Sequence, residues 1–248
     1  MKVVRFEVNG TVVQGKLDGN KVIPVSESSG AQEYALEAGR LLAPVQPTKV
    51  VAIGLNYRDH AEEVHLPLQD EPILFIKPSS SVIGPLDPIL LPRTSRRVDY
   101  EAELAVVIGK KARNVPEDRA AEYIAGYSCL NDVTARDFQK KDGQWTRAKS
   151  FDTFCPIGPW VETEVDPSDL AIELLLNGEP KQRSRTSNLI FNPFQLVAFV
   201  SGVMTLFPGD VIATGTPSGI GRLAPGDQVE VRIEGIGSLI NVVKNSDE

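Results

Sequence analysis

The sequence has little of what marks secreted or membrane-spanning proteins. Its only two cysteines, Cys129 and Cys155, lie in mostly apolar stretches, which predicts two reduced thiols in the core and a reducing compartment. No apolar run reaches the ~18 residues of a membrane span. The N-terminal MKVVRFEVNG alternates apolar and polar residues instead of forming the apolar centre of a signal peptide. We therefore predict a cytoplasmic protein with no membrane partner.

Excess positive charge is also missing. The 248 residues include 26 basic and 33 acidic ones, for a net charge of -7. A nucleic-acid surface needs clustered Lys and Arg, so we expect no nucleic-acid partner. An anionic small molecule would need a local positive site. A chain of this length with 42% hydrophobic residues can bury one large core, or one core and a small appendage.

Turn residues divide the first part of the chain. The pairs Asn9-Gly10 and Gly19-Asn20 predict hairpins between three short strands. Residues 31–41 are expected to be helical, and the proline-bearing stretch that follows marks a boundary. The sequence thus predicts a small N-terminal α+β domain at residues 1–45 and a larger domain at 46–248.

In the larger domain, strand-like segments outnumber helical ones. The helices are expected at residues 57–64, 116–123, 133–141 and 193–202. Strands and helices do not alternate regularly, and prolines and glycines punctuate the chain. These features favour a mainly β fold with peripheral helices (α+β) over a doubly wound parallel sheet.

Acidic residues lead into the most apolar strand. Glu101 and Glu103 share a face with Ala105 and Val107, about 7 Å apart along the strand. Two carboxylates at the edge of burial need a counter-charge, which Mg²⁺ or Mn²⁺ would supply. Asp132 follows another apolar strand and is a candidate third ligand. Taken separately, the Glu-x-Glu pair also fits a solvated strand end, and Asp132 also fits a helix cap.

Three further segments carry groups suited to chemistry. His60 and Glu63 fall three residues apart on a helix, where a carboxylate can orient an imidazole as a general base; a surface ion pair has the same spacing. Lys149 stands at the start of an apolar, strand-like run and is either a surface cation or a charge aimed into a site. The glycine-rich loop at 213–221 fits an anion-binding nest or a tight turn.

Together these segments resemble the fumarylacetoacetate hydrolase family, in the branch of acylpyruvate hydrolases, oxaloacetate decarboxylases and 2-hydroxyhepta-2,4-diene-1,7-dioate isomerases. The resemblance covers residues 49–243 and is carried by GLNYRDHAEE, PILFIKPSSS, DYEAELAVVIGK, NDVTARDFQ, WTRAKSFDTFCPIGP and FPGDVIATGTPSGIG. It implies a β-roll catalytic domain behind a small N-terminal domain, and a homodimer.

The resemblance also implies roles for particular residues. Those roles are metal ligands (Glu101, Glu103 and Asp132), a cation beside the metal (Lys149), an acid/base pair on a lid helix (His60 and Glu63), and contacts near the substrate carboxylate (Arg136, Gln139 and Thr216). The implied metal is Mg²⁺ or Mn²⁺, with Ca²⁺ as a substitute in crystals.

The implied activity is metal-dependent chemistry on a small 2-oxo (di)carboxylic acid through an enolate. Hydrolysis of a C-C bond or decarboxylation is the first expectation, and isomerisation of a 2-hydroxyhepta-2,4-diene-1,7-dioate in aromatic catabolism is the alternative. A non-catalytic dicarboxylate-binding protein is the alternative of another class. Acylpyruvate-cleaving members often have a basic residue where this chain has Leu55, so the substrate stays open.

Overall fold

The computed structural model describes residues 1–248 except 26–31, 64, 66 and 247–248. The strands are β1 (Lys2–Val8), β2 (Thr11–Asp18), β3 (Lys21–Pro24), β4 (Tyr34–Ala35), β5 (Arg40–Leu41), β6 (Lys49–Gly54), β7 (Ile73–Pro78), β8 (Val82–Ile83), β9 (Ile89–Leu91), β10 (Val98–Tyr100), β11 (Ala102–Ile108), β12 (Ile124–Asn131), β13 (Thr134–Ala135), β14 (Cys155–Glu162), β15 (Ala171–Leu176), β16 (Glu179–Arg185), β17 (Val211–Ala213), β18 (Gly221–Arg222), β19 (Gln228–Ile233) and β20 (Gly237–Asn245). The α-helices are α1 (Arg58–Glu63), α2 (Arg136–Asp142), α3 (Thr146–Lys149) and α4 (Pro193–Val203). Short 3-10 helices lie at Leu36–Ala38, Ser79–Ser81, Glu117–Tyr123, Pro167–Asp169 and Thr186–Asn188.

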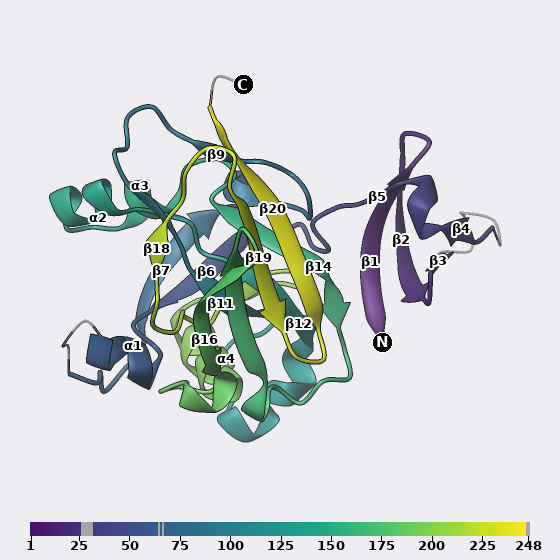
Figure 1. Ribbon diagram of the computed structural model, residues 1–248. Coiled ribbons are helices and arrows are strands. Elements are labelled where there is room, and N and C mark those ends of the chain that lie inside the picture. Colours follow the sequence, from purple (N-terminus) through teal and green to yellow (C-terminus); the bar gives the residue numbers. More distant parts are fainter. Residues whose placement is uncertain (26–31, 64, 66, 247–248) are drawn as a thin grey trace.

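Three sheets carry the fold (Figure 1). The largest has the order β4-β3-β2-β1-β14-β12-β11-β17-β6-β7, with β5 beside β1 and β8 beside β14. A second has the order β16-β15-β19-β20-β9, and a small third has β13-β10-β18. Helices are few and lie outside these sheets, so the mainly β architecture with peripheral helices is confirmed.

The main core fills the space between the two larger sheets. Leu104 and Val106 of β11 belong to the same buried cluster as Leu174 of β15 and Val231 of β19. The alternate residues of β11, such as Val107, join a second buried cluster on the other face. Because both faces are covered, β11 is buried along its whole length.

The N-terminal strands have a hydrophobic cluster of their own. Phe6, Val13 and Val22 are buried in it, with Trp160 of β14 packed against them. In Figure 1 this segment stands to one side of the body, joined to it through the pairing of β1 with β14. These contacts support our proposal that residues 1–45 form a small domain.

The expected helix at residues 31–41 is wrong. The described part of that range forms β4, a 3-10 turn and β5, which pair with β3 and β1. Gly39 shows why the chain is extended here: a Cβ at Gly39 would lie 2.1 Å from the carbonyl oxygen of Glu7. The backbone therefore packs directly on β1, which a helix of larger diameter cannot do.

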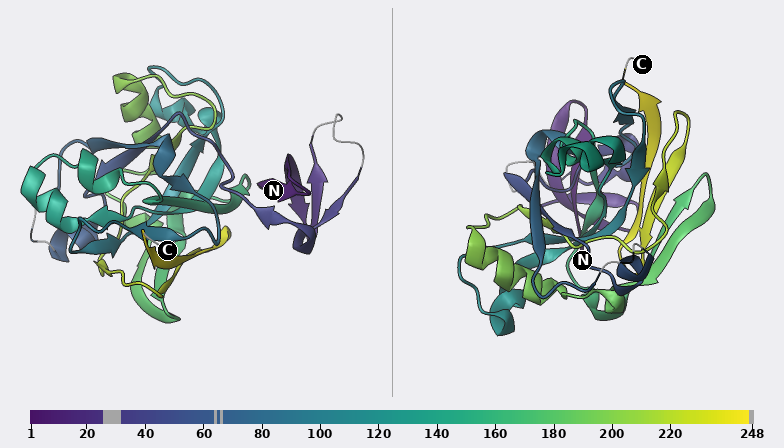
Figure 2. Two further views of the ribbon diagram at one scale, coloured as in Figure 1. Left: turned by 90° about the horizontal axis from the view of Figure 1, so that it is seen from above. Right: turned by 90° about the vertical axis from the view of Figure 1, so that its left-hand side faces the viewer.

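The other expected helices are found with shifted ends or a tighter winding. The range 57–64 corresponds to α1, and 193–202 to α4, whose start carries a capping box between Asn192 and Gln195. The range 133–141 holds β13 and then α2, whereas 116–123 is a 3-10 helix. Helices α1, α2 and α3 lie on the side of the molecule away from β1–β5, as Figures 1 and 2 both show. Among the described residues, no helix combines the length and apolar character needed to cross a membrane.

Candidate active site

Three carboxylates meet at the ends of buried strands. Glu101 joins β10 to β11, Glu103 lies in β11, and Asp132 follows β12. Each offers an oxygen within 4.8 Å of the others, and the three residues are 5%, 1% and 1% exposed. The alternative of a solvated strand end is therefore wrong for this Glu-x-Glu pair.

Local backbone bonds hold this convergence. The N–H of Asp132 donates to the carbonyl of Glu101 at 2.9 Å, and the N–H of Glu101 donates to the side-chain oxygen of Asn131 at 2.9 Å. The residue before α2 is Ala135, which makes no side-chain cap. The helix-cap interpretation of Asp132 is therefore wrong, because its carboxylate faces the other acidic groups.

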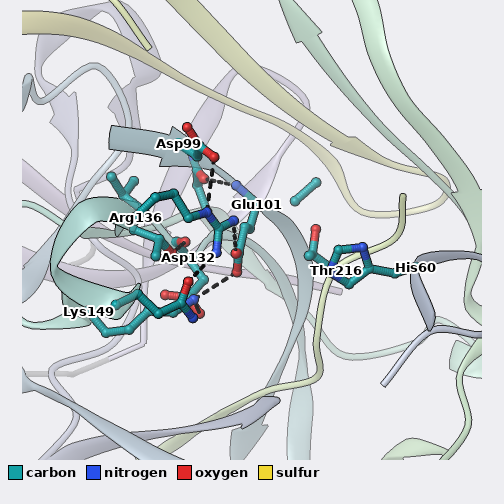
Figure 3. A network of polar contacts seen from close by, with 12 residues as sticks. His60, Asp99, Glu101, Asp132, Arg136, Lys149 and Thr216 are labelled. Atoms are coloured by element: carbon teal, nitrogen blue, oxygen red, sulfur yellow. Dashed lines mark hydrogen bonds and ion pairs between the residues drawn. The ribbon is translucent and has the colours of Figure 1, made fainter. Parts of the chain in front are cut away.

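Cations surround two of the three carboxylates (Figure 3). The Lys149 ammonium donates to Glu101 at 2.8 Å and to Asp132 at 2.6 Å. The other oxygen of Asp132 accepts from Lys77 at 2.5 Å, and Arg136 also donates to Glu101. Lys149 ends the short helix α3 instead of beginning a strand. It is 2% exposed, which excludes the surface-cation interpretation.

These contacts set the protonation of the cluster. Burial works against the charge of Glu101, but Lys149 and Arg136 outweigh it and lower the pKa of that carboxyl to about 2. Burial also opposes the charge of Lys149, while the carboxylates of Asp132 and Glu101 raise its pKa. The charged forms are thus stabilised in both side chains.

Glu103 is in a different position. Within the described part of the chain, no salt bridge reaches it, and its Oε2 accepts from the N–H of Gly215 at 2.8 Å. Burial, together with the negative charges of Asp132 and Glu101, raises its pKa well above the ordinary value. Hard oxygen donors with an uncompensated buried carboxyl fit a divalent cation such as Mg²⁺ or Mn²⁺.

A cavity of about 410 Å³ opens beside the cluster. Its lining comprises Ile53, Gly54, Leu55, His60, Phe75, Arg97, Asp99, Glu101, Glu103, Arg136, Gln139, Trp145, Lys149, Thr216 and Ile220. Seven of the nine residues singled out from the sequence are therefore brought to one cavity. The other two, Asp132 and Glu63, lie behind lining residues that they contact, Lys149 and His60. The volume suits a small metabolite.

The His-Glu pair has the geometry of an oriented base. The Nδ1 atom of His60 lies 2.8 Å from Oε2 of Glu63. The other oxygen of Glu63 accepts from the N–H of Gly219 at 3.0 Å, which fixes the carboxylate in turn. Among the described residues, Nε2 of His60 has no hydrogen-bond partner, and His60 lines the cavity.

One loop links the pair to the carboxylates. It follows β17 and carries Gly215, which binds Glu103, Thr216, which lines the cavity, and Gly219, which binds Glu63. The expected anion-binding nest is thus directed at the protein's own carboxylates. Gly215 has a φ of +96°, and a Cβ there would lie 2.8 Å from the Cβ of Asn56, so glycine is required.

Sequence reasoning missed three residues that belong to the site. Lys77 is fully buried on β7, and a lysine inside the apolar run ILFIKP was the available signal. Arg97 lines the cavity and donates two hydrogen bonds, of 2.9 and 3.0 Å, to the carboxylate of Asp99. Gln182 is buried against the loop, but the polar strand EPKQRSR gave no sign of it.

Comparison with known proteins identifies the family. Residues 49–244 match the model described as the C-terminal domain of fumarylacetoacetate hydrolase. The chain belongs to the fumarylacetoacetate hydrolase family. Oxaloacetate tautomerase Fahd2a, mitochondrial, from Rattus norvegicus is 45% identical to this family member, over 94% of this chain and 79% of that protein.

Solved structures agree with this assignment. A 5-carboxymethyl-2-hydroxymuconate delta-isomerase from Mycobacterium smegmatis has a TM-score of 0.93 and 44% identity, with all of both chains covered. A fumarylacetoacetate hydrolase from Exiguobacterium antarcticum has a TM-score of 0.89 and 38% identity, covering 99% of each chain. Such relatives are named as tautomerases, isomerases and hydrolases, and this fumarylacetoacetate hydrolase family member is an enzyme.

Proposed function

We propose that this enzyme uses a divalent metal ion to interconvert the keto and enol forms of a small 2-oxo dicarboxylic acid such as oxaloacetate. One observation carries the proposal: a single cavity is lined by the carboxylates of Glu101 and Glu103 and by the ring of His60. A molecule bound in this cavity would therefore contact both the metal ion and the proton acceptor.

The carboxylates Glu101, Glu103 and Asp132 would hold the ion. A divalent cation there would supply Lewis acidity toward the carboxylate and keto oxygens of a chelating 2-oxo acid. The ammonium of Lys149 adds a positive charge beside the same oxygens, where negative charge develops when the substrate loses a proton.

The proton itself is assigned to His60. Its Nε2 would take a proton from the carbon next to the keto group and deliver a proton to the keto oxygen, or do the reverse. Glu63 keeps the ring in one orientation and stabilises the protonated imidazole through the 2.8 Å contact. The C–H bond next to the keto group breaks and an O–H bond forms, or the reverse, so atoms balance within the substrate without water and without cleavage of a C–C bond.

Basic and polar side chains within the cavity lining support a substrate with two carboxylates. Gln139, Arg136 and Thr216 are the family-matched contacts for one carboxylate, and all three line the cavity. Arg97 offers a second site, because its side chain is 55% exposed and uses only Nε and Nη2 to hold Asp99. Within the described residues its Nη1 donates no hydrogen bond, so it is free to bind a distal carboxylate.

The names of the relatives favour proton transfer over the C-C hydrolysis or decarboxylation expected from the sequence. The rat protein is named as a tautomerase and the mycobacterial structure as an isomerase. Both reactions move protons and leave the carbon skeleton whole. Hydrolysis of an acylpyruvate is the second candidate, supported by the hydrolase structure from Exiguobacterium antarcticum, and it would need His60 to activate water.

Deuterium exchange separates these activities. In D₂O with Mg²⁺, we expect the enzyme to exchange the C3 protons of oxaloacetate about 100-fold faster than the same sample treated with EDTA. NMR follows exchange and substrate loss together, and a panel with acetylpyruvate, fumarylpyruvate and a hydroxymuconate-type diene identifies other products. Cleavage or CO₂ release without accelerated exchange would contradict the proposal.

A further inference from the structure

The buried side-chain amide of Gln182 connects strand β11 with the loop after β17. It lies in β16 and is 1% exposed, whereas the neighbouring Lys181 and Arg183 point to the opposite, exposed face. Its side chain reaches both β11 and the loop after β17. It does not line the cavity itself, so any effect on a ligand must pass through the residues it holds.

The orientation of this amide is fixed by its partners. Its Oε1 accepts from the backbone N–H of Ala102 at 2.9 Å, and its Nε2 donates to the carbonyl of Pro217 at 2.8 Å. A flipped amide would set a donor against the Ala102 donor and an acceptor against the Pro217 acceptor. The second hydrogen of Nε2 must then be donated to Oγ1 of Thr216, at 2.9 Å.

This contact determines what the Thr216 hydroxyl can do. A hydroxyl has one proton to donate. Because Gln182 donates to the Thr216 oxygen, Thr216 does not donate its proton to Gln182. Among the described residues, the Thr216 hydroxyl donates to no protein acceptor. Thr216 lines the cavity, so its proton is available to an oxygen of a bound molecule.

Gln182 also sets the position of that hydroxyl relative to the carboxylates. Its Oε1 accepts a hydrogen bond from the N–H of Ala102, which lies between Glu101 and Glu103 in the chain. The loop carrying Thr216 is therefore tied by one side chain to the strand segment that carries both glutamates. The amide fixes the distance from the hydroxyl to the predicted metal ligands without touching either glutamate side chain.

We infer that Gln182 is a positioning residue that turns the Thr216 hydroxyl into a hydrogen-bond donor to the substrate carboxylate. The inference rests on the proposed function in one respect, namely that a carboxylate occupies the cavity. It predicts that the two side chains act as one unit: removing either loses the same hydrogen bond, and removing both loses nothing more.

A double-mutant cycle tests this coupling. The proteins are the native enzyme, Gln182→Met, Thr216→Val and the double variant, with Lys181→Met as the control that places the same new side chain on the outer face of β16. The probe is oxalate with saturating Mg²⁺, because oxalate offers two carboxylates but has no proton to transfer. Calorimetry gives its Kd, and the KM and kcat for oxaloacetate are measured in parallel.

We expect each single variant to weaken oxalate binding about tenfold, as for a lost hydrogen bond to a charged group. The double variant should bind within about twofold of either single variant, and Lys181→Met should bind like the native protein. The KM for oxaloacetate should follow the same pattern, with a smaller change in kcat. A double variant weakened about 100-fold, the product of two independent effects, would overturn the inference, as would native affinity in Gln182→Met.

Two further outcomes keep the inference separate from the proposed function. If the two substitutions are coupled in oxalate binding but the native protein does not convert oxaloacetate, the proposed activity is refuted and the role of Gln182 stands. Turnover with additive effects would refute only the role of Gln182. If Gln182→Met does not fold, Gln182→Glu replaces it in the same cycle. In the Thr216→Val background the hydroxyl is absent, so Gln182→Glu then changes oxalate binding only through its added charge. That effect is subtracted from the effect of Gln182→Glu in the native background.

Discussion

Glu101, Glu103 and Asp132 are ordinary carboxylates set apart by their surroundings. Lysine or arginine side chains reach Glu101 and Asp132, whereas Glu103 is met by a backbone N–H and by the charge of its neighbours. Because burial raises the pKa of Glu103 well above the ordinary value, this carboxyl has most to gain from a bound cation.

His60 carries the first prediction at this scale. We expect His60→Ala to lower kcat for keto–enol interconversion of oxaloacetate by about 100-fold, because His60 is the proposed proton acceptor, with a much smaller change in KM. The chain offers a matched control, since its other histidine, His65, is exposed and does not line the cavity. His65→Ala should keep native kinetics, and native rates in His60→Ala would remove this residue from the mechanism.

Single residues were predictable from the sequence where a short motif carries them. The Glu-x-Glu pair, Asp132 and the His-Glu pair were all singled out, and the structure brings them to one region. Lys77 was not, because its role depends on the position of β7 relative to Asp132, 55 residues further along the chain. Gln182 depends on the pairing of β16 and on a loop 34 residues away, which local patterns do not encode.

At the scale of elements, the loop after β17 connects cluster, cavity and acid/base pair. Gly215 holds Glu103 through its N–H and adopts a φ of +96°. Groups that orient metal ligands typically contribute 10- to 100-fold to metal affinity. We expect Gly215→Ala to weaken Mn²⁺ binding about tenfold in a calorimetric titration, since the new Cβ would displace the loop from Asn56.

Gly226 is the control for backbone strain. Its φ of +88° is similar, but a Cβ there would meet no atom within 4 Å. Gly226→Ala should therefore lose about 1 kcal/mol of stability from the positive φ and keep native Mn²⁺ affinity. Equal loss of metal affinity in the two variants would show that the loop does not act through Glu103.

Elements were predictable where periodicity and turn residues agree. The hairpins at the N-terminus and the buried strand β11 follow the expected pattern, and α4 begins at an Asn-Pro cap. The helix expected at 31–41 failed because strand pairing with β1 and the close approach at Gly39 override local helix propensity. Helix α3 was missed because it spans only Thr146–Lys149, too short for a periodic signal.

At the scale of the whole molecule, Asp210 joins segments far apart in the chain. Its fully buried carboxylate accepts from the N–H and hydroxyl of Thr48 at 2.9 and 2.7 Å, from Lys49 at 2.5 Å and from the N–H of Phe207 at 2.9 Å. Burial raises the pKa of Asp210, but the hydrogen bonds from Lys49, Phe207 and Thr48 outweigh it and lower the pKa below the ordinary 3.8.

This lowered pKa gives a prediction with a definite sign. A depressed folded-state pKa stabilises the fold above the unfolded value, and the contribution is lost as pH falls through the folded one. Asp210→Asn should cost about 2 kcal/mol in the free energy of unfolding at pH 7. The difference from the native protein should shrink below pH 3.8.

Urea unfolding at several pH values measures this difference. Asp169 provides the control, because its ion pair with Arg185 joins side chains that are 54% and 47% exposed. Asp169→Asn should leave the unfolding midpoint unchanged at pH 7. A pH-independent loss in Asp210→Asn would show that shape, and not charge, matters at Asp210.

The family and fold class could be read from the sequence because six motifs keep their order along most of the chain. The domain boundary at 45/46, the homodimer and the cytoplasmic location stay predictions. Light scattering of the purified protein tests the dimer. The reaction could not be read, because proton transfer, hydrolysis and decarboxylation place the same demands on the acidic cluster.

We expect the three carboxylates Glu101, Glu103 and Asp132 to hold one divalent cation. Calorimetric titration of Mn²⁺ into EDTA-treated protein tests it most directly, with Glu103→Gln as the site variant and Glu162→Gln, a buried carboxylate that instead contacts the N-terminal amine, as the control. We predict one ion per chain in the native protein and in Glu162→Gln, and at least a 100-fold loss of affinity in Glu103→Gln, on the order of 3 kcal/mol. Native affinity in Glu103→Gln, or no Mn²⁺ binding by the native protein, would contradict the claim.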